Sequence, residues 1–499
     1  MLTQSDIIYF LFTDRFCNGD KKNDFNINPD DPQGFHGGDF AGIIKKLPYL
    51  KKLGVTALWI TPVCQNIEFT QEPKFRNRAY HGYWTLDFEK VDRHLYSEDP
   101  NIPPGDRKYL RQLSDAIHSH GMKLILDIVI NHTGYEHPWQ QEKPWWFHPP
   151  GYEDDIRRYL YGLPDLNLSH PDVIDYFTHN IIDWVRDGNI DGIRMDAVKH
   201  IDKPFWYHLK ASLRGACPGI SIFGEAFDYD PAHIADYQDF YDFDSMIDFP
   251  LKNAMNEVFV GEAPFYRIAR PRLSDNETPG ALDMDLKYNN PYRLITFLDN
   301  HDMPRFITEL LNHYGYDGDG RYLALNSYLE AYTFLLTCRG IPQIFYGDEI
   351  GMEGGNDPDN RRDMPWQIMK NDAPNPAGAP ESSMIFDYFR KLLKARNDNA
   401  ALQYGSLLTL WVDNFVMIYL RYIDGNIVVC AFNNGRYPME THITVPYHTN
   451  ANIPTRVRET MAQKKVVYSA LNDYGKITFT NEGFEIQMKA KSGDIFPVC

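Results

Sequence analysis

Residues 122–132 have the sequence MKLILDIVINH, an almost unbroken apolar run with Asp127 inside it and Asn131 and His132 at its end. Apolar continuity without polar alternation is typical of a parallel strand that is buried on both faces. Similar runs recur along the chain, and each predicts a strand. Together the predicted strands are Ile7–Phe12, Val55–Ile60, Met122–Ile130, Asp191–Asp196, Ser221–Glu225, Leu294–Asp299 and Ile341–Tyr346.

Helix-like segments separate these runs, such as Phe40–Leu53 and Lys108–His120, the second of which is closed by Gly121. Strand–helix alternation over roughly 400 residues favours a closed α/β barrel, a (β/α)₈ TIM barrel, over an open sheet. We assign residues 1–132 and 169–400 to this catalytic barrel. Residues 133–168, which are rich in Pro, Trp and Tyr, form an inserted loop domain after the third strand.

The sequence changes character after residue 400, where short alternating segments are joined by turn signals. This pattern predicts a separate C-terminal antiparallel β-domain, a β-sandwich over residues 401–499. Its expected strands are Phe415–Tyr422, Ile427–Asn433, Thr441–Pro446, Lys476–Thr480 and Phe484–Lys489.

The overall composition narrows the classes of partner. The 499 residues carry a net charge of −18, which disfavours binding to nucleic acid or to anionic membranes and suits a neutral substrate. No apolar run is long enough to span a bilayer, no signal peptide is visible, and the six cysteines form no zinc or disulfide pattern. We therefore expect a cytoplasmic protein.

Polar residues gather where the predicted strands end. Arg194 and Asp196 end one strand, Glu225 ends another, and His301 and Asp302 follow a third. In a (β/α)₈ barrel the carboxyl ends of the strands share one mouth, where the chemistry takes place. These side chains are therefore expected to converge.

Two of these carboxylates suit retaining glycoside hydrolysis, in which one carboxylate attacks the anomeric carbon and a carboxylic acid about 5–5.5 Å away protonates the leaving oxygen. Asp196 and Glu225 end neighbouring strands. Arg194 lies on the same side of its strand as Asp196 and is expected to keep that carboxylate ionised. Glu225 lies between Phe223 and Phe227, a partly apolar setting that raises the pKa of an acid.

Six motifs in order resemble those of the α-amylase superfamily, glycoside hydrolase family thirteen, and most closely those of α-amylases, cyclomaltodextrinases and cyclodextrin glucanotransferases. The resemblance covers about Ile7 to Trp366. The motifs are HGYW (81–84), DIVINH (127–132), LPDLN (163–167), GIRMDAVKH (192–200), GEAF (224–227) and FLDNHD (297–302).

The resemblance implies that Asp196 is the nucleophile, that Glu225 is the acid/base, and that Asp302 grips sugar hydroxyls and helps to distort the ring. It assigns four further side chains to the same glucose: a stacking ring at Tyr83 and hydroxyl contacts from His81, His132 and His301. Arg194 would orient the nucleophile. Any one of these residues alone is explained as well by a capped strand end or a paired buried polar group, but the ordered set is not.

Other positions bear on specificity. Lys199 and His200 resemble the pair found in enzymes that act on α-1,4 links. Asp357 and Arg361 resemble residues that hold the second or third glucose, although an ordinary charged loop fits them equally well. Two aromatic positions align with acceptor-side rings of the glucanotransferases, although both could be core aromatics. They are Tyr161 and Phe227.

The resemblance also implies calcium. Asn131, Asp165 and the carbonyl of His200 match the superfamily's usual site, and oxygen ligands suit this hard cation. A second set resembles a calcium site of the glucanotransferase group, although Asn and Asp are also common turn formers. This second set is Asn18, Asp20, Asn23, Asp24, Gly37 and Asp39.

These features predict a retaining glycosidase that hydrolyses α-1,4 links of maltooligosaccharides, cyclodextrins or soluble α-glucan through a covalent glycosyl-enzyme intermediate. The alternative enzyme is a 4-α-glucanotransferase. A non-catalytic carbohydrate-binding relative is a third reading, which the presence of all three carboxylates disfavours.

Overall fold

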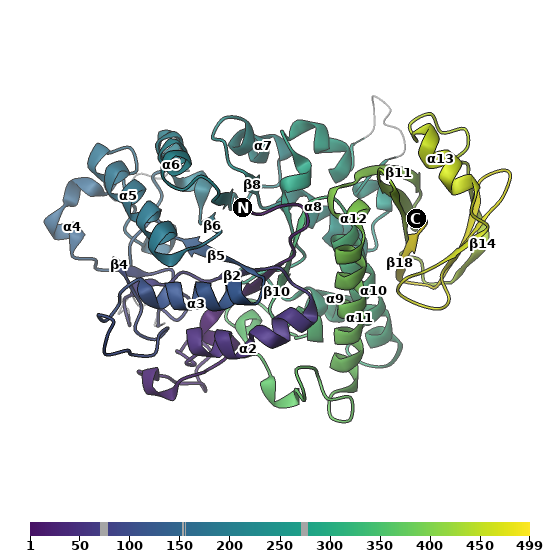
Figure 1. The fold of residues 1–499 in the computed structure, drawn as a ribbon. Helices are drawn as coiled ribbons and strands as arrows, with labels where there is room; N and C mark the ends of the chain where they lie inside the picture. The colour runs from purple at the N-terminus through teal and green to yellow at the C-terminus, as the bar shows by residue number, and fades with distance from the viewer. Residues whose placement is uncertain (70–77, 152–153, 155, 271–277) are drawn as a thin grey trace.

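The computed structural model describes residues 1–69, 78–151, 154, 156–270 and 278–499 (Figure 1). Eight parallel strands form one sheet in the order β8-β7-β6-β5-β2-β1-β10-β9. The two end strands meet, because Ile247 forms a parallel bridge with Ile295 and the Asp248 amide donates to the Ile295 carbonyl at 2.9 Å. The sheet is therefore a closed barrel. Its strands are β1 (Ile8–Leu11), β2 (Ala57–Ile60), β5 (Lys123–Ile128), β6 (Gly192–Met195), β7 (Ser221–Gly224), β8 (Ser245–Met246), β9 (Ile295–Thr296) and β10 (Ile341–Phe345).

Helices alternate with these strands and surround the barrel. After the single turn of α1 (Thr13–Phe16), α2 begins where the Asp39 carboxylate accepts from the Gly42 amide at 2.6 Å, and it ends at Gly54, whose φ of 103° is left-handed. The helices are α2 (Phe40–Leu53), α3 (Lys108–Ser119), α5 (Pro171–Gly188), α6 (Lys203–Ala216), α7 (Pro231–Asp239), α8 (Phe249–Met255), α9 (Phe306–Tyr314), α10 (Gly318–Thr337), α11 (Pro380–Asp398) and α12 (Ala400–Tyr404).

The excursion after β5 packs mainly through aromatic side chains and contains a short helix, α4 (Trp139–Glu142). It lies against a hairpin of β3 (Cys64–Asn66) and β4 (Thr85–Val91), since the Gly134 amide donates to the Thr85 carbonyl at 2.7 Å. Residues 152, 153 and 155 of the predicted inserted domain lie outside the described residues.

The C-terminal part of the chain forms two antiparallel sheets with an apolar core of their own between them. Against the barrel side, the buried Arg421 guanidinium donates to the carbonyls of Thr337 and Cys338, both at 2.6 Å. Figure 1 accordingly shows this domain beside α10 and α12. Its elements are β11 (Ser406–Val412), β12 (Val416–Ile423), β13 (Asn426–Asn433), β14 (Met439–Val445), α13 (Thr455–Ala462), β15 (Val466–Tyr468), β16 (Lys476–Phe479), β17 (Phe484–Met488) and β18 (Ser492–Pro497).

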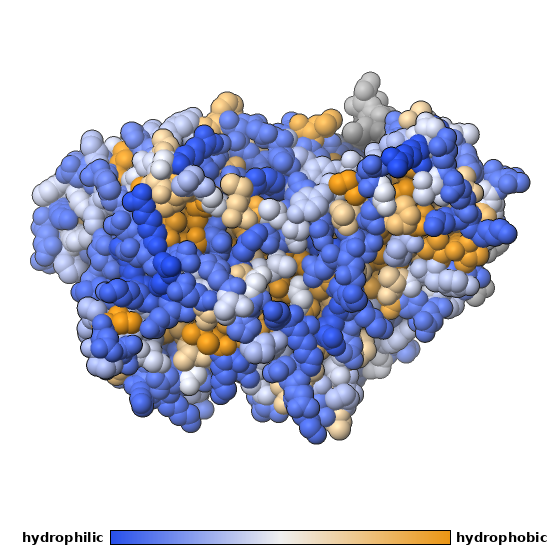
Figure 2. Space-filling model, in the orientation of Figure 1, coloured by the Kyte–Doolittle hydropathy of each residue, from blue (hydrophilic) through white to orange (hydrophobic). Residues whose placement is uncertain are grey.

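The predicted fold class is confirmed, and every predicted strand is present with its ends shifted by a few residues. The sequence analysis predicted no strand for β8, which is only two residues long, or for β3, β4, β11, β15 and β18, and it predicted no helix for α13. The proposed domain boundaries stay predictions. Of the helices described, none is both long and apolar enough to cross a membrane. Figure 2 shows a mostly hydrophilic face on which apolar residues form small separate groups, as expected for a chain with net charge −18.

Candidate active site

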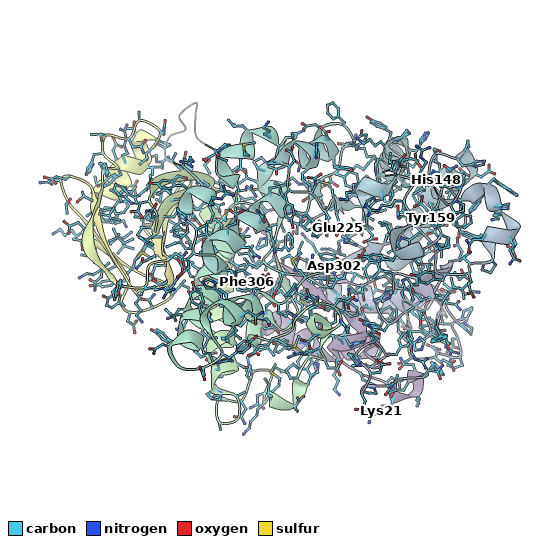
Figure 3. The ribbon with its side chains drawn as sticks, turned by 180° about the vertical axis from the view of Figure 1, so that it is seen from behind. Lys21, His148, Tyr159, Glu225, Asp302 and Phe306 are labelled. Carbon is cyan, nitrogen blue, oxygen red and sulfur yellow. The ribbon has the colours of Figure 1, made fainter. Side chains whose placement is uncertain are left out.

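The predicted catalytic residues lie at one end of the barrel. Arg194 belongs to β6, Asp196 follows β6 directly, Glu225 follows β7, and His301 and Asp302 follow β9. Because all the barrel strands are parallel, these positions share the mouth formed by the carboxyl ends of the strands. Figure 3 shows Glu225 and Asp302 near each other in the catalytic domain, and it shows His148 and Tyr159 together farther out in the excursion.

Arg194 holds three carboxylates together. Its Nη1 donates to Asp196 Oδ1 at 2.6 Å and to Asp127 Oδ1 at 2.9 Å, while Nη2 lies 3.0 Å from Glu225 Oε2. The guanidinium is almost completely buried, so this contact is little screened by water. The predicted pairing of Arg194 with Asp196 is present, and the same group brings the second catalytic carboxyl to it.

Burial raises the pKa of Glu225 to about 7. The nearby Arg194 opposes this shift in pKa, while the negative charges of Asp196 and Asp302 add to it. The Ala197 amide also contacts Glu225 Oε2 at 3.2 Å. The expected rise in the pKa of Glu225 is confirmed, and a carboxyl in this state keeps a proton near neutral pH that it can give to a leaving oxygen.

Asp127 is a site residue that the sequence analysis quoted but did not assign. Its Oδ2 accepts from Tyr83 Oη at 2.9 Å and from Trp59 Nε1 at 3.2 Å, and its Oδ1 accepts from Arg194. Burial raises the pKa of Asp127 to about 6. The one acidic residue inside an apolar strand was the available signal, and Asp127 links the nucleophile side of the site to the Tyr83 ring.

The Tyr83 and His301 rings are parallel, 7° apart in plane and 5.4 Å apart in centroid, and Tyr83 Oη lies 2.9 Å from His301 Nε2. His132 Nε2 contacts the Tyr83 carbonyl at 3.1 Å, and the Tyr83 amide donates to His81 Nδ1 at 3.0 Å. Burial lowers the pKa of His81, His132 and His301. The three imidazoles are therefore neutral near pH 7 and can exchange hydrogen bonds with hydroxyl groups.

Arg361 connects the predicted donor-side loop to the catalytic carboxyls. Its Nη1 lies 3.0 Å from Asp357 Oδ1 and donates to Tyr80 Oη at 3.2 Å, Nη2 lies 3.5 Å from Asp302 Oδ1, and Nε donates to the His301 carbonyl at 3.0 Å. The Asp302 side chain remains 38% exposed, so its oxygens face the open mouth. Asp357 and Arg361 thus contact the residues beside the catalytic carboxyls, and their role in binding a glucose stays a prediction.

The remaining predicted substrate contacts differ in exposure. Lys199 Nζ donates to the Phe227 carbonyl at 2.8 Å, and His200 is buried on the short helix η4 (Val198–His200) that follows the nucleophile. Phe227 and Tyr161 are 42% and 75% exposed. Both rings are accessible to a ligand, which contradicts the alternative that they are core aromatics.

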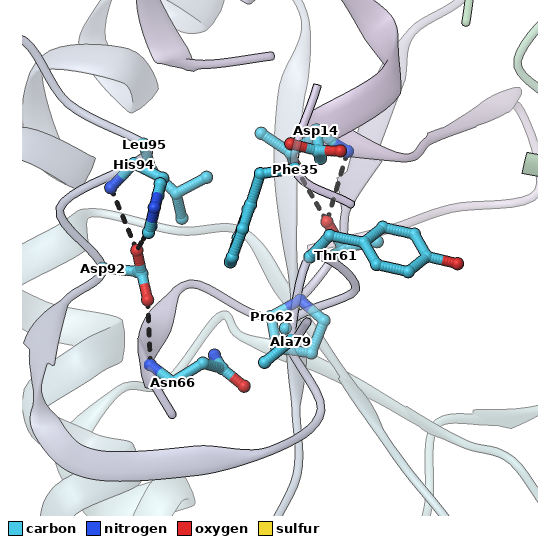
Figure 4. A pocket seen from close by; sticks show the side chains of 12 residues that line it. Asp14, Phe35, Thr61, Pro62, Asn66, Ala79, Asp92, His94 and Leu95 are labelled. Carbon is cyan, nitrogen blue, oxygen red and sulfur yellow. Dashed lines mark hydrogen bonds and ion pairs between the residues drawn. The ribbon is translucent and has the colours of Figure 1, made fainter. Parts of the chain in front are cut away.

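A small cavity lies elsewhere, lined by Asp14, Phe35, Asn66, Asp92 and His94 among others (Figure 4). Its volume of about 20 Å³ accommodates about one water molecule. Phe35 stacks on His94 at 3.9 Å, and Asp92 accepts from the Asn66 amide at 2.9 Å. This cavity is too small for a sugar and does not compete with the barrel mouth as a substrate site.

At the first predicted calcium site, Asn131 and Asp165 lie on two paired segments. The Leu166 amide donates to the Asn131 carbonyl at 2.9 Å, and the backbones of His132 and Asp165 form an antiparallel β-bridge. Asp165 Oδ1 is buried and has no hydrogen-bond partner among the described residues, while Oδ2 lies 2.7 Å from His148 Nδ1. Burial raises the pKa of Asp165 to about 6. The free oxygen suits a cation, and His148, which the sequence analysis missed, shares this carboxylate.

At the second predicted site, Asn18 Nδ2 donates to Asp24 Oδ1 at 2.8 Å. Within the described part of the chain the buried amide oxygens of Asn18 and Asn23 have no hydrogen-bond partner. A Cβ at Gly37, whose φ is 89°, would lie 2.6 Å from Asn18 Nδ2 and 2.8 Å from Asp24 Oδ1, so only glycine leaves this space open.

Two carboxylates of the second set have other partners. Asp39 accepts from three backbone amides and from Asn23 Nδ2, and Asp20 accepts from the Lys22 amide. These contacts are the turn and cap functions that Asp commonly serves. Across the described ranges, no cluster of three or more His, Cys, Asp or Glu side chains is placed to hold a metal ion. Calcium would therefore depend on amide and carbonyl oxygens as well.

The family model for the α-amylase catalytic domain matches residues 10–154 and 145–405. A β/α-amylase of Paenibacillus polymyxa is 33% identical over 97% of this chain, and a cyclomaltodextrinase of Thermoanaerobacter pseudethanolicus is 31% identical over 87% of it. The chain spans 38% of the length of the first relative and 71% of the second.

Solved structures match over nearly the whole chain. An α-amylase from Geobacillus thermoleovorans in complex with acarbose has a TM-score of 0.78 and 30% identity, covering 100% of this chain and 99% of that one. A cyclomaltodextrin glucanotransferase with a three-domain arrangement has a TM-score of 0.79 and 28% identity, covering 99% of each chain. Amylases and glucanotransferases both share this architecture.

Proposed function

Because the chain belongs to the α-amylase family, we propose that it is a retaining glycosidase that hydrolyses α-1,4 links of maltooligosaccharides, cyclodextrins or soluble α-glucan. One observation carries the proposal: Arg194 brings Asp196 and Glu225 together while the pKa of Glu225 is raised to about 7. This arrangement places the proposed nucleophile beside a protonated acid, the pair that retaining hydrolysis requires.

In the first step, an Asp196 oxygen forms a bond to the anomeric carbon of the glucose at the mouth. The glycosidic bond to the leaving oxygen breaks, and that oxygen takes the proton of Glu225. In the second step, the Glu225 carboxylate takes a proton from water, and the resulting hydroxide oxygen bonds to the anomeric carbon as the ester to Asp196 breaks. Arg194 orients Asp196 throughout.

The surrounding side chains bind the glucose that is attacked. Tyr83 provides a ring surface, and the neutral imidazoles of His81, His132 and His301 pair with its hydroxyl groups. Asp302, which is partly exposed, binds hydroxyls more tightly as the ring flattens toward an oxocarbenium-like state. Asp357 and Arg361 hold a glucose farther along the donor side, and Lys199 and His200 support a preference for α-1,4 links.

The second candidate is a 4-α-glucanotransferase, in which a sugar hydroxyl replaces water in the second step. The observation that favours it is the exposure of the Tyr161 and Phe227 rings, on which an acceptor sugar could stack. A non-catalytic binding protein has less support, since the three carboxylates and their partner Arg194 form one connected network.

We also propose calcium as a structural ion. At the first site Asn131, Asp165 and the carbonyl of His200 would bind it, with His148 competing for Asp165. At the second site Asn18, Asn23 and Asp24 would bind it beside Gly37, while Asp20 and Asp39 hold the loop in shape. When bound, calcium would neutralise these oxygens and fix the excursion and the N-terminal loop. We also propose that the protein is cytoplasmic.

Product analysis on maltoheptaose tests the proposal, with wild type compared with Glu225→Gln. Hydrolysis predicts only oligosaccharides shorter than the substrate, and transfer predicts products longer than it. Glu225→Gln is expected to form neither. If wild type and variant are equally inert on maltoheptaose and on cyclodextrins, the proposed activity is wrong.

A further inference from the structure

A groove of about 540 Å³ lies where the C-terminal domain meets the barrel. Its walls come from the loop that follows β13, from the β11–β12 turn and from Glu262 beyond α8. None of the residues assigned above to the barrel mouth lines it. Its volume is in the range of small-molecule sites, so it can accommodate a short oligosaccharide.

Two large rings stand open in this groove. Tyr437 is 83% exposed and Phe415 is 59% exposed. They flank Gly435: a Cβ there would lie 3.7 Å from Phe415 Cβ and 3.9 Å from the Tyr437 carbonyl oxygen. A single exposed ring is common on a protein surface, but two on one groove form a ligand-sized apolar platform.

The loop that carries Tyr437 is held in one shape. Asn433 Nδ2 donates to the Tyr437 carbonyl at 3.1 Å and to the Lys489 carbonyl at 2.8 Å. Asn434 Nδ2 donates to the Val258 carbonyl of the barrel at 2.7 Å, and Asn434 Oδ1 accepts from Lys491 Nζ at 2.7 Å. A platform fixed before binding loses little conformational entropy when a ligand arrives.

The two charged residues that line the groove, Arg436 and Glu262, pair with each other, and Glu262 also pairs with a buried lysine behind the groove. Arg436 Nη2 lies 2.8 Å from Glu262 Oε2, and the buried Lys491 Nζ lies 3.1 Å from Glu262 Oε1. Arg436 is 56% exposed at its side chain, so it keeps further N–H groups for a ligand. Open rings beside paired hydrogen-bonding groups suit a neutral ligand with apolar faces and hydroxyls.

We propose that this groove is a second glucan-binding site, separate from the barrel mouth, in which glucose rings stack on Phe415 and Tyr437 and their hydroxyls bind Arg436 and Glu262. The site holds a neighbouring stretch of a long α-glucan while its end or a loop occupies the mouth. The choice of α-glucan as the ligand rests on the proposed function.

Gel retardation by soluble starch tests this inference, using the full chain with Glu225→Gln so that the starch is not consumed. Tyr437→Ala and Phe415→Ala on that background are expected to weaken the apparent affinity for starch by about tenfold each. The control is Tyr468→Ala, because Tyr468 is 64% exposed on β15 of the same domain and does not line the groove. It is expected to change nothing. Equal retardation of all three variants would overturn the inference.

Kinetics separate this site from the mouth. In the otherwise unaltered chain, Tyr437→Ala is expected to raise the KM for soluble starch and to leave kcat/KM for maltoheptaose within about twofold. An equal loss on both substrates would show that the change acts at the mouth or on the fold, and the second site would be wrong. A wild type that cleaves no α-glucan would refute the proposed function, while the starch gel would still decide whether the groove binds glucan.

Discussion

Arg194 Nη2 lies 3.0 Å from Glu225 Oε2, yet the pKa of Glu225 is raised to about 7. An adjacent guanidinium normally lowers the pKa of a carboxyl group, because its charge favours the ionised form. Here the same guanidinium also contacts Asp127 and Asp196, so its charge is shared, and burial penalises ionised Glu225 more than Arg194 favours it. Arg194 can thus orient Asp196 while Glu225 keeps its proton near neutral pH.

This balance predicts the pH dependence of catalysis. Glu225 acts as an acid only while it is protonated, so kcat/KM on maltoheptaose is expected to fall as the pH rises through about 7. The measurement is a pH profile of kcat/KM from pH 5 to 9. With α-maltosyl fluoride, whose leaving group needs little protonation, the alkaline decline should weaken. An alkaline limb that stayed unchanged with this substrate would contradict the assignment of Glu225.

The same pKa predicts an effect on stability. Burial raises the pKa of Glu225 from its ordinary value of 4.5 to about 7, so its contribution to folding stability is complete below pH 4.5 and is lost as the pH rises through 7. Glu225→Gln avoids burying that charge, so at pH 8 it is expected to raise the free energy of unfolding by on the order of 1–3 kcal/mol, and by less at pH 5. Chemical denaturation at both pH values measures this. The control is Asp175→Asn, since the Asp175 side chain is 77% exposed; a gain for Glu225→Gln that did not grow with pH would count against the shift.

Arg361 is expected to orient Asp302 and to help bind the glucose on the donor side of the cleaved bond. Arg361→Lys keeps the charge but loses the planar fork that reaches Asp357, Tyr80 and the His301 carbonyl, so kcat/KM on maltoheptaose should fall about 10- to 100-fold. The adjacent Arg362→Lys is a matched control, because the Arg362 side chain pairs with Asp359 at the exposed surface. Equal activity of the two variants would remove Arg361 from the site.

Calcium is expected to stabilise the N-terminal loop. A chelator should lower the melting temperature of wild type by several degrees, and added calcium should restore it. Asn23→Ala removes a buried amide oxygen without a described hydrogen-bond partner and should reduce this calcium-dependent shift. Asp30→Asn, at an exposed position of the same loop, should keep it. If neither the chelator nor added calcium changes the melting temperature, calcium does not stabilise this loop and the proposed site is wrong.

Much of the fold was predictable because buried parallel strands leave continuous apolar runs, as in Lys123–Ile128 of β5. Strand β8 was not predictable, because Ser245–Met246 is too short to leave a sequence pattern. It is defined by its pairing with β7. One edge strand of the C-terminal domain, β15, was missed for a related reason: it is three residues long, and its side chains alternate between exposed and half-buried.

The site could be predicted as a set of residues but not as a network. The motifs placed Asp196, Glu225 and Asp302 at strand ends, and the parallel barrel brings such ends together. Arg194 contacts Asp127, Asp196 and Glu225 because β5, β6 and β7 lie side by side in a particular register. No local sequence pattern specifies that register. His148 was missed because its contact with Asp165 spans an excursion that has no regular period.

The anomeric form of the first product tests most directly whether Asp196 is the nucleophile of a retaining reaction. Proton NMR during hydrolysis of maltoheptaose should show the new reducing end appearing as the α-anomer and only later equilibrating with the β-anomer, because two displacements at one carbon retain its configuration. Asp196→Asn should form no product. The β-anomer appearing first would mean inversion and would contradict Asp196 as the nucleophile of a covalent intermediate.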